Sequence, residues 1–270
     1  MNIVRLAIGL SVLSVFPGFA QTAPEKTPPA NTAPTEKSAA AEKASPYLKR
    51  ADVSQTADGV RITANSPRPL EQTLQALQQK YGWVVNYEDP QFSSHLDFVD
   101  SPSEQAQVPA GGNFTVEFPA AAPDEEKTLR LVVDAYNQSK NPGRFEVRHG
   151  APAGFYIVGT AAHDEKGAIS QQKVLLDFPV TLPTRERTIV ETIDLICQQI
   201  AAQSHTAVTL GIFPRTFLSH TPVKVGGTKV PARELLLQSL AAAHHTLYWR
   251  LLFDPGSKGY FLSIHSVKPA

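Results

Sequence analysis

The spacing of apolar residues changes repeatedly along the chain from about residue 53 onward. One stretch begins at Pro69 and ends at Gly82, and its apolar positions follow the intervals i, i+4, i+7 and i+11. Such positions share one face of a helix, and glycine is favoured just past a helix end. The sequence therefore predicts a helix whose buried face carries Leu70, Leu74, Leu77 and Tyr81.

A second helix is predicted from about Asp124, with acidic residues in its first turn, where the helix dipole favours negative charge. Short alternating or apolar runs around the two helices predict strands. A polar stretch that contains proline and glycine, residues 93–112, separates two of these strands. The second helix has Leu129, Val132, Val133 and Tyr136 on one face, and the predicted strands cover residues 60–63, 83–87, 114–118, 145–148 and 155–158.

Residues 173–270 repeat this order of elements. A strand with alternating apolar residues over 174–180 precedes a helix for which Thr184 is a suitable N-cap. A later helix starts near Pro231, because proline fits the first helical turn. The first helix of this half has the same apolar intervals, at Ile189, Ile193, Ile196 and Ile200, and the remaining predicted strands cover 207–210, 223–225 and the hairpin 247–253 and 260–264.

The repeated order predicts an α+β fold made of two tandem βαββαββ modules. In each module, two helices pack on small mixed sheets. The first module covers residues 53–160 and the second covers residues 173–270. The segment 161–172 is polar and breaks the periodicity, so it is interpreted as an interdomain linker.

Residues 1–20 have the pattern of a cleavable signal peptide. Arg5 supplies the positive charge, an apolar run covers residues 6–16, and Gly18-Phe19-Ala20 is a small-x-small cleavage signal. The run is shorter than the roughly 20 residues that a membrane span needs. We therefore expect export to the periplasm and no membrane span after cleavage. Residues 21–52, rich in alanine, proline and threonine, are predicted to be a disordered linker.

Net charge and cysteine content limit which partners the chain can bind and whether disulfides can stabilise it. The formal net charge is zero, so the chain lacks the basic surface expected of a nucleic-acid-binding protein. Cys197 is the single cysteine, which excludes a disulfide framework within one chain. Because it lies on the apolar stripe of its helix, we predict a buried free thiol; a disulfide between two chains is the alternative.

The sequence contains no pattern typical of a catalytic or metal site. His244 and His245 are adjacent, whereas metal ligands on one helix are typically spaced i, i+4. His205 and His220 lie in predicted loops. Neither a glycine-rich phosphate loop nor a G-x-S-x-G elbow occurs. We therefore predict no enzyme activity, no cofactor and no metal site.

The loop over residues 212–218 is unusually apolar for a connection. Phe213, Arg215 and Phe217 belong to residue types that often carry the binding energy of protein interfaces, which makes them candidate contacts for a partner. The alternative is that both phenylalanine rings fold back onto the second core. An unprotected edge near a terminal hairpin is a further candidate, because it can accept a strand from a partner.

Two helix starts carry a resemblance to a known family. The order of elements, with P-L-E-x-x-L-x-x-L at residues 69–77 before Gly82 and V-P-A-R-E-L-L at residues 230–236 before Leu247, resembles the secretin and TonB short N-terminal domain. The resemblance covers most of residues 53–267 as two copies, with residues 93–112 as an insertion. It implies periplasmic modules that bind other proteins, such as inner-membrane components of secretion machines or an anti-sigma regulator. It carries over no catalytic residue.

The expected function follows from export and from this resemblance. Because no barrel or secretin region follows before Ala270, we expect a stand-alone protein. It is predicted to be a periplasmic protein–protein interaction adaptor or regulator, for an outer-membrane secretion, pilus or TonB-linked assembly, with an envelope protein as partner. The alternative is a periplasmic protein that binds a small ligand or glycan in a pocket between its two domains.

Overall fold

The computed structural model describes residues 51–101, 106–119, 123–150 and 154–267. The predicted signal peptide over 1–20 and all but the end of the predicted linker over 21–52 lie outside these ranges. The described residues fall in one compact unit and combine helices with several sheets, which confirms the α+β class. Within these ranges, no helix has both the length and the apolar character to cross a bilayer.

The elements of the first half precede residue 164, and those of the second half follow it. The first half contains the helices α1 (Pro69–Tyr81) and α2 (Glu125–Gln138) and the strands β1 (Asp52–Gln55), β2 (Val60–Ala64), β3 (Val85–Glu88), β4 (Phe98–Ser101), β5 (Ala106–Pro109), β6 (Phe114–Phe118), β7 (Arg144–His149) and β8 (Phe155–His163). The second half contains the helices α3 (Ile189–Ser204), α4 (Arg215–Leu218) and α5 (Ala232–Ala241), the 3-10 helix η2 (Leu175–Asp177), and the strands β9 (Ile169–Gln171), β10 (Pro179–Thr188), β11 (Val208–Leu210), β12 (Pro222–Pro231), β13 (Leu247–Asp254) and β14 (Gly259–Ser266).

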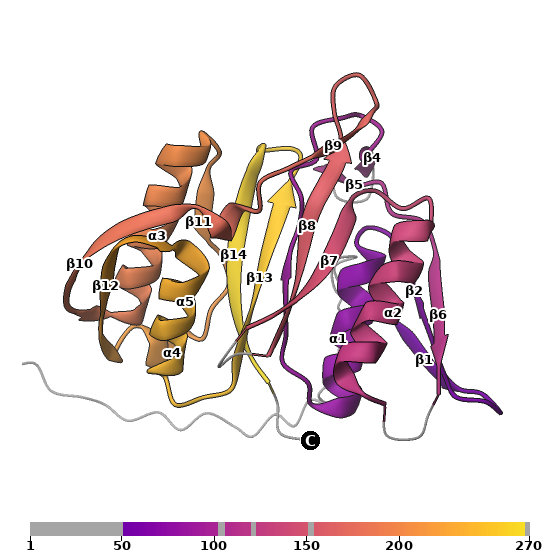
Figure 1. Cartoon of the computed structure of the whole chain (residues 1–270), viewed down its shortest axis with the longest axis horizontal. Helices are drawn as coiled ribbons and strands as arrows, with labels where there is room; N and C mark the ends of the chain where they lie inside the picture. The colour runs from indigo at the N-terminus through magenta and orange to yellow at the C-terminus, as the bar shows by residue number, and fades with distance from the viewer. Residues whose placement is uncertain (1–50, 102–105, 120–122, 151–153, 268–270) are drawn as a thin grey trace, which may run out of the picture. The chain divides into compact units, whose positions relative to one another are not determined.

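One seven-stranded sheet contains strands from both halves. Its order is β11-β14-β13-β3-β8-β7, and β9 pairs with the end of β8. The halves meet where β13 pairs in parallel with β3, with Arg250 beside Tyr87 and Leu251 beside Glu88. Figure 1 shows this sheet between the helices α3 and α5 on one side and α1 and α2 on the other. The two halves therefore share a sheet, which the repeat pattern alone did not predict.

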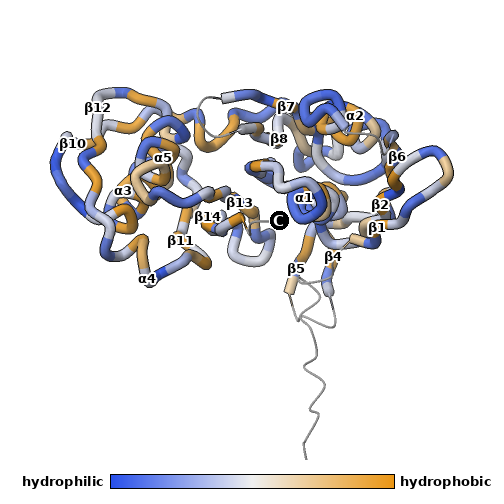
Figure 2. Tube along the Cα trace, turned by 90° about the horizontal axis from the view of Figure 1, so that it is seen from below, coloured by the Kyte–Doolittle hydropathy of each residue, from blue (hydrophilic) through white to orange (hydrophobic). Residues whose placement is uncertain are grey.

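The central sheet is buried on both faces, and β8 shows how. Phe155 and Ile157 join the core formed with α1 and α2, whereas Tyr156 and Val158 join the core formed with α3 and α5. Successive side chains of a strand point to opposite faces, so a strand covered on both sides is apolar at consecutive positions. In Figure 2, hydrophobic residues gather around α1 and α2 and also around α3 and α5.

The first core follows the predicted helix stripes closely. Leu70, Leu74 and Leu77 are almost fully buried, and α1 ends on Gly82 in the left-handed conformation, with φ of 71°. In α2, the Asp124 side chain caps the helix by accepting a hydrogen bond from the Lys127 N–H at 2.8 Å. The antiparallel sheet β1-β2-β6 covers these helices. The predicted helices and their buried faces are therefore confirmed.

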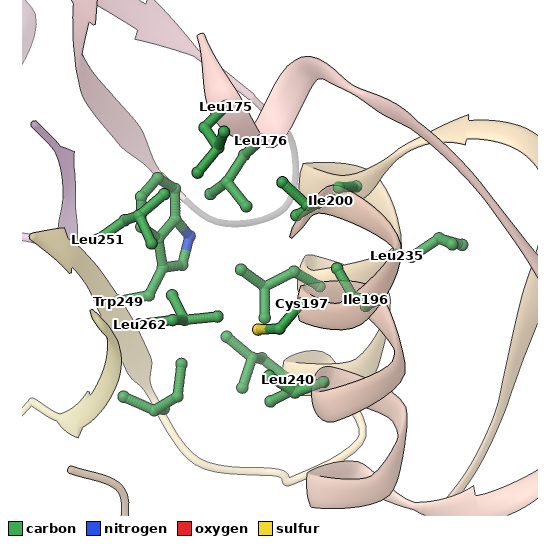
Figure 3. Close-up of a cluster of buried hydrophobic side chains, with 14 of the residues drawn as sticks. Leu175, Leu176, Ile196, Cys197, Ile200, Leu235, Leu240, Trp249, Leu251 and Leu262 are labelled. Atoms are coloured by element: carbon green, nitrogen blue, oxygen red, sulfur yellow. The ribbon is translucent and has the colours of Figure 1, made fainter. Parts of the chain in front are cut away.

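The second core is built around α3. Its four stripe isoleucines are fully buried and pack with α5 and with Trp249 of β13; Figure 3 shows Ile196, Cys197 and Ile200 of α3 facing Trp249 and Leu262. The helix starts later than predicted. Thr188, not Thr184, is the N-cap, in a capping box with Glu191. Thr184 lies within β10, because this strand continues to the first residue before the helix.

Four predicted irregular or extended segments have a different structure. The stretch 93–112 contains the antiparallel strands β4 and β5, and the loop 212–218 contains α4. Residues 174–180, predicted as one strand, begin with η2 and enter β10 only at Pro179. The segment 161–172, predicted as an interdomain linker, includes the end of β8 and its partner β9. Short elements of this kind depend on contacts elsewhere in the fold and have weak local signals.

Replacing Ile193 with alanine is expected to lower the free energy of unfolding by about 2–5 kcal/mol. Ile193 is fully buried at the centre of the α3 stripe, so the truncation leaves a cavity. Urea denaturation followed by far-UV circular dichroism measures the change. Val190→Ala, on a partly buried position of the same helix, is the control and should cost less. Equal stabilities for wild type and Ile193→Ala would contradict the orientation of α3.

Candidate functional site

The two halves are joined by buried charges as well as by the sheet. Arg250 of β13 is 1% exposed and points to the first half. Its Nε donates to Glu71 of α1 at 3.0 Å, and its guanidinium also donates to the Gln78 side chain and the Val85 carbonyl. A buried cation is tolerated only when it is paired and hydrogen-bonded, so this arginine makes the position of β13 depend on α1.

Glu88 makes the corresponding contact in the opposite direction, from β3 of the first half to the second half. One carboxylate oxygen accepts hydrogen bonds from the N–H groups of Leu175 and Leu176 in η2. The other is 3.0 Å from an Nη of Arg233 in α5. Next to Glu88, Asp89 pairs with Arg68 at 2.8 Å and accepts a hydrogen bond from the Phe253 N–H at 3.0 Å. These contacts tie the halves into one body.

The predicted partner contacts lie on and beside α4. The Phe213 and Phe217 side chains are partly buried and pack against the second core. The exposed Arg215 guanidinium lies 5.9 Å from the centre of the Phe213 ring, and Phe217 packs on His245 with ring centres 4.5 Å apart. The fold-back of the rings, which was the alternative, agrees with this packing. The role of these three residues in binding a partner stays a prediction.

The large apolar residue of this loop that reaches solvent is Ile212, whose exposed fraction is 74%. Ile212 directly follows Gly211 at the end of β11. Phe261 of β14, which pairs with Thr209 of β11, is 42% exposed. Two large apolar side chains thus lie at the β11 end of the central sheet. The sequence identified the loop as apolar but not its exposed member, because a local pattern does not show which side chains the core covers.

Strand β11 is a terminal strand of the central sheet. Its inner side is hydrogen-bonded to β14. The Tyr260 N–H donates to the Ala207 carbonyl, and the Gly211 N–H donates to the Leu262 carbonyl, both at 2.8 Å. In a parallel pair, alternate residues direct their backbone groups to opposite sides. The N–H and C=O groups of Val208 and Leu210 therefore point away from β14, where they can pair with another strand.

Two other strand edges are blocked by amide side chains. On β7, the backbone N–H and C=O of Phe145 both bond to the Asn137 side chain of α2, at 2.9 and 2.8 Å. On β10, the backbone of Thr181 makes the same reciprocal pair of bonds with Gln199 of α3. A side-chain amide in this position occupies the groups that an added strand would need. Within the described ranges no side chain is recorded in the same role on β11.

A pocket of about 470 Å³ lies where the two halves meet. The first half contributes Gly82, Trp83, Val84, Glu125 and Gly154, and the second contributes residues of α5 and of the start of β13. Strands β8 and β13 both run upward in Figure 1, so the pocket is at the lower end of the sheet in that view. Binding pockets commonly form at such junctions.

Metal-ligating and nucleophilic side chains do not converge in the part of the chain that the structure describes. No group of three or more histidine, cysteine, aspartate or glutamate side chains there could hold a metal ion. Cys197 is 2% exposed in the second core, and burial raises the pKa of its thiol to about 12. A thiol that stays protonated is a poor nucleophile.

The candidate site therefore consists of the β11 edge with Ile212 and Phe261, and of the separate pocket at the junction. Sequence reasoning named the apolar loop, an unprotected edge near a terminal hairpin and, as an alternative, a pocket between the two domains, but not the residues that form the edge or the pocket. The lining of the pocket, Glu125 included, left no sequence signal, because its residues come from distant segments. Comparison of the chain with protein-family models, with curated proteins and with solved structures gave no match.

Proposed function

We propose that this protein is an exported adaptor or regulator that binds another protein of the cell envelope, and that it is not an enzyme. The observation that carries the proposal is the uncapped β11 edge beside Ile212 and Phe261. An edge with free backbone groups can accept a strand from a partner, and neighbouring apolar side chains add contact area. On β7 and β10 amide side chains occupy the corresponding backbone groups, whereas on β11 no such bond is found among the described residues.

The envelope location rests on the signal-peptide pattern of residues 1–20. The resemblance to the secretin and TonB short N-terminal domain adds the class of partner, a component of a secretion, pilus or TonB-linked assembly. We also propose that the halves are two copies of one βαββαββ module. Corresponding pairings support this: β3 with β8 and β11 with β14 are parallel, and β2 with β6 and β10 with β12 are antiparallel.

A photo-crosslinking amino acid at position 212 is expected to trap a discrete adduct with an envelope protein in cells that naturally produce the chain. Ile212 is exposed and follows the proposed pairing strand, so its side chain would lie at the interface. Position 169 is the matched control, because Ile169 is also exposed, at 45%, but lies on β9. Gel shift and mass spectrometry of the adduct measure the outcome.

A second variant tests the strand pairing itself. Leu210→Pro removes the N–H that points away from β14 and leaves the bonds to β14 in place, because they involve the neighbouring residues. The adduct from position 212 should then weaken or disappear while the protein remains folded. A folded protein that gives no adduct at 212, or equal adducts at 212 and 169, would refute the proposed surface.

A second candidate function is the binding of a small ligand or glycan between the halves. The pocket of about 470 Å³ favours it, since small-molecule sites usually have volumes of roughly 300–1,000 Å³. This site shares no residue with the β11 edge, so one protein can have both.

A further inference from the structure

The pocket at the junction has an apolar floor made by two adjacent strands. β3 and β13 pair in parallel with Arg250 beside Tyr87, and the same register carried back three residues places Leu247 beside Val84. Both residues line the pocket, as does the buried Leu240 of α5. The floor therefore suits the hydrocarbon part of a ligand.

An aromatic wall stands beside this floor. Trp83 lines the pocket and is partly exposed. Its ring stacks on Tyr81 of α1, with centres 4.8 Å apart and planes inclined by 23°, so its orientation is held before any ligand arrives. A tryptophan face attracts cations as well as apolar groups.

Glu125, the first residue of α2, adds a carboxylate to these apolar surroundings. Its Oε1 atom is buried, yet it has no hydrogen-bond partner among the described residues. Burial raises the pKa of this carboxyl group and Asp124 adds to the rise, while His149 opposes it. A buried acceptor without a donor costs free energy. Because Glu125 also lines the pocket, a cation bound there would lie beside this carboxylate and offset part of that cost.

The pocket rim supplies no strong cation of its own. His245 lines the pocket but packs on Phe217, and His149 lies near enough to Glu125 to lower its pKa without forming a recorded hydrogen bond. No lysine or arginine is among the residues that line the pocket. The site thus combines a carboxylate in the first turn of α2 with apolar and aromatic walls, and its lining contains no lysine or arginine.

We propose that this pocket binds a small organic cation, a protonated amine or quaternary ammonium group carried on an apolar body. The ammonium group donates to Glu125 and lies against Trp83, while the body covers Val84, Leu240 and Leu247. This inference goes beyond the adaptor function. Because the pocket and the β11 edge share no residue, failure of one proposal leaves the other intact.

The test uses phenethylamine as the cationic probe and 2-phenylethanol as a neutral probe of nearly the same shape. Titration calorimetry of the purified protein at pH 7.5 measures both affinities. We expect saturable binding of phenethylamine that is at least about tenfold tighter than that of 2-phenylethanol, the lower end of what a hydrogen bond to a charged group contributes.

Glu125→Gln should remove this preference and leave the weak binding of 2-phenylethanol unchanged. Glu126→Gln is the matched control, because Glu126 is the next residue, is exposed and pairs with Arg130 outside the pocket. If Glu125→Gln does not fold, Ala241→Phe replaces it, since Ala241 is an exposed lining residue of α5 and a larger side chain there fills the pocket. No saturable binding, or undiminished binding to Glu125→Gln or Ala241→Phe, would overturn the proposal.

Discussion

Replacing Arg250 with leucine is expected to lower the free energy of unfolding by about 3–5 kcal/mol. The arginine is 1% exposed, and its partner Glu71 is also buried. Removing the guanidinium leaves the Glu71 carboxylate, the Gln78 amide oxygen and the Val85 carbonyl without their shared donor. Chemical denaturation measures the loss. Because Arg250 links β13 to α1, the variant should also loosen the junction, which hydrogen exchange on β3 and β13 would detect.

Arg130→Leu is the matched control for this prediction. Arg130 also pairs with a glutamate, at 2.6 Å, but both side chains are about half exposed, and exposed pairs contribute about 0–1 kcal/mol. The double variant Glu71→Leu/Arg250→Leu should recover part of the lost stability, because it removes the unpaired charge as well. If Arg250→Leu were no more damaging than Arg130→Leu, the buried pair would not hold the junction.

The second large effect concerns pH. Burial raises the pKa of Glu88 from 4.5 to about 7, and the Arg233 guanidinium and the two η2 N–H groups oppose this rise without cancelling it. The folded state therefore holds this proton more tightly than the unfolded state. For a carboxyl group with a raised pKa, the contribution to stability is greatest below pH 4.5 and falls as pH increases to about 7. At about 1.4 kcal/mol per pKa unit, the free energy of unfolding should fall by about 3 kcal/mol over this pH range.

The measurement is urea denaturation between pH 4.5 and 8 for wild type and Glu88→Gln. Glutamine has no proton to lose, so the stability of wild type relative to the variant should decrease as pH rises through this window. Glu186→Gln, at an exposed position of β10, is the control and should run parallel to wild type. A difference between wild type and Glu88→Gln that stays constant over the window would show that Glu88 does not change its ionisation there.

Both predictions concern the junction, and their consequence for function is the same. Glu71, Glu88, Arg233 and Arg250 hold the halves together from either side of the shared sheet. The pocket lies on this junction, so loosening it should weaken ligand binding there. The β11 edge lies at the far end of the sheet order and should be less affected.

Local periodicity in the sequence determined most of the helices and strands. The intervals of Leu70 to Tyr81 and of Ile189 to Ile200 specified two helices and their buried faces, and Gly82 specified where the first one ends. These features depend on residues within a few positions of each other, so they can be predicted from sequence alone. The hairpin of β13 and β14 belongs to the same group, since its strands are close in sequence.

The pairing of β13 with β3, and everything built upon it, was decided by the tertiary structure. Arg250 and Tyr87 are neighbours in the sheet although 163 positions separate them, and no local pattern reports such a pairing. Burial of charge has the same origin, because Glu88 and Arg250 acquire their environment only when the halves meet. The exposure of Ile212, the free edge of β11 and the lining of the pocket likewise depend on which surfaces the cores leave uncovered.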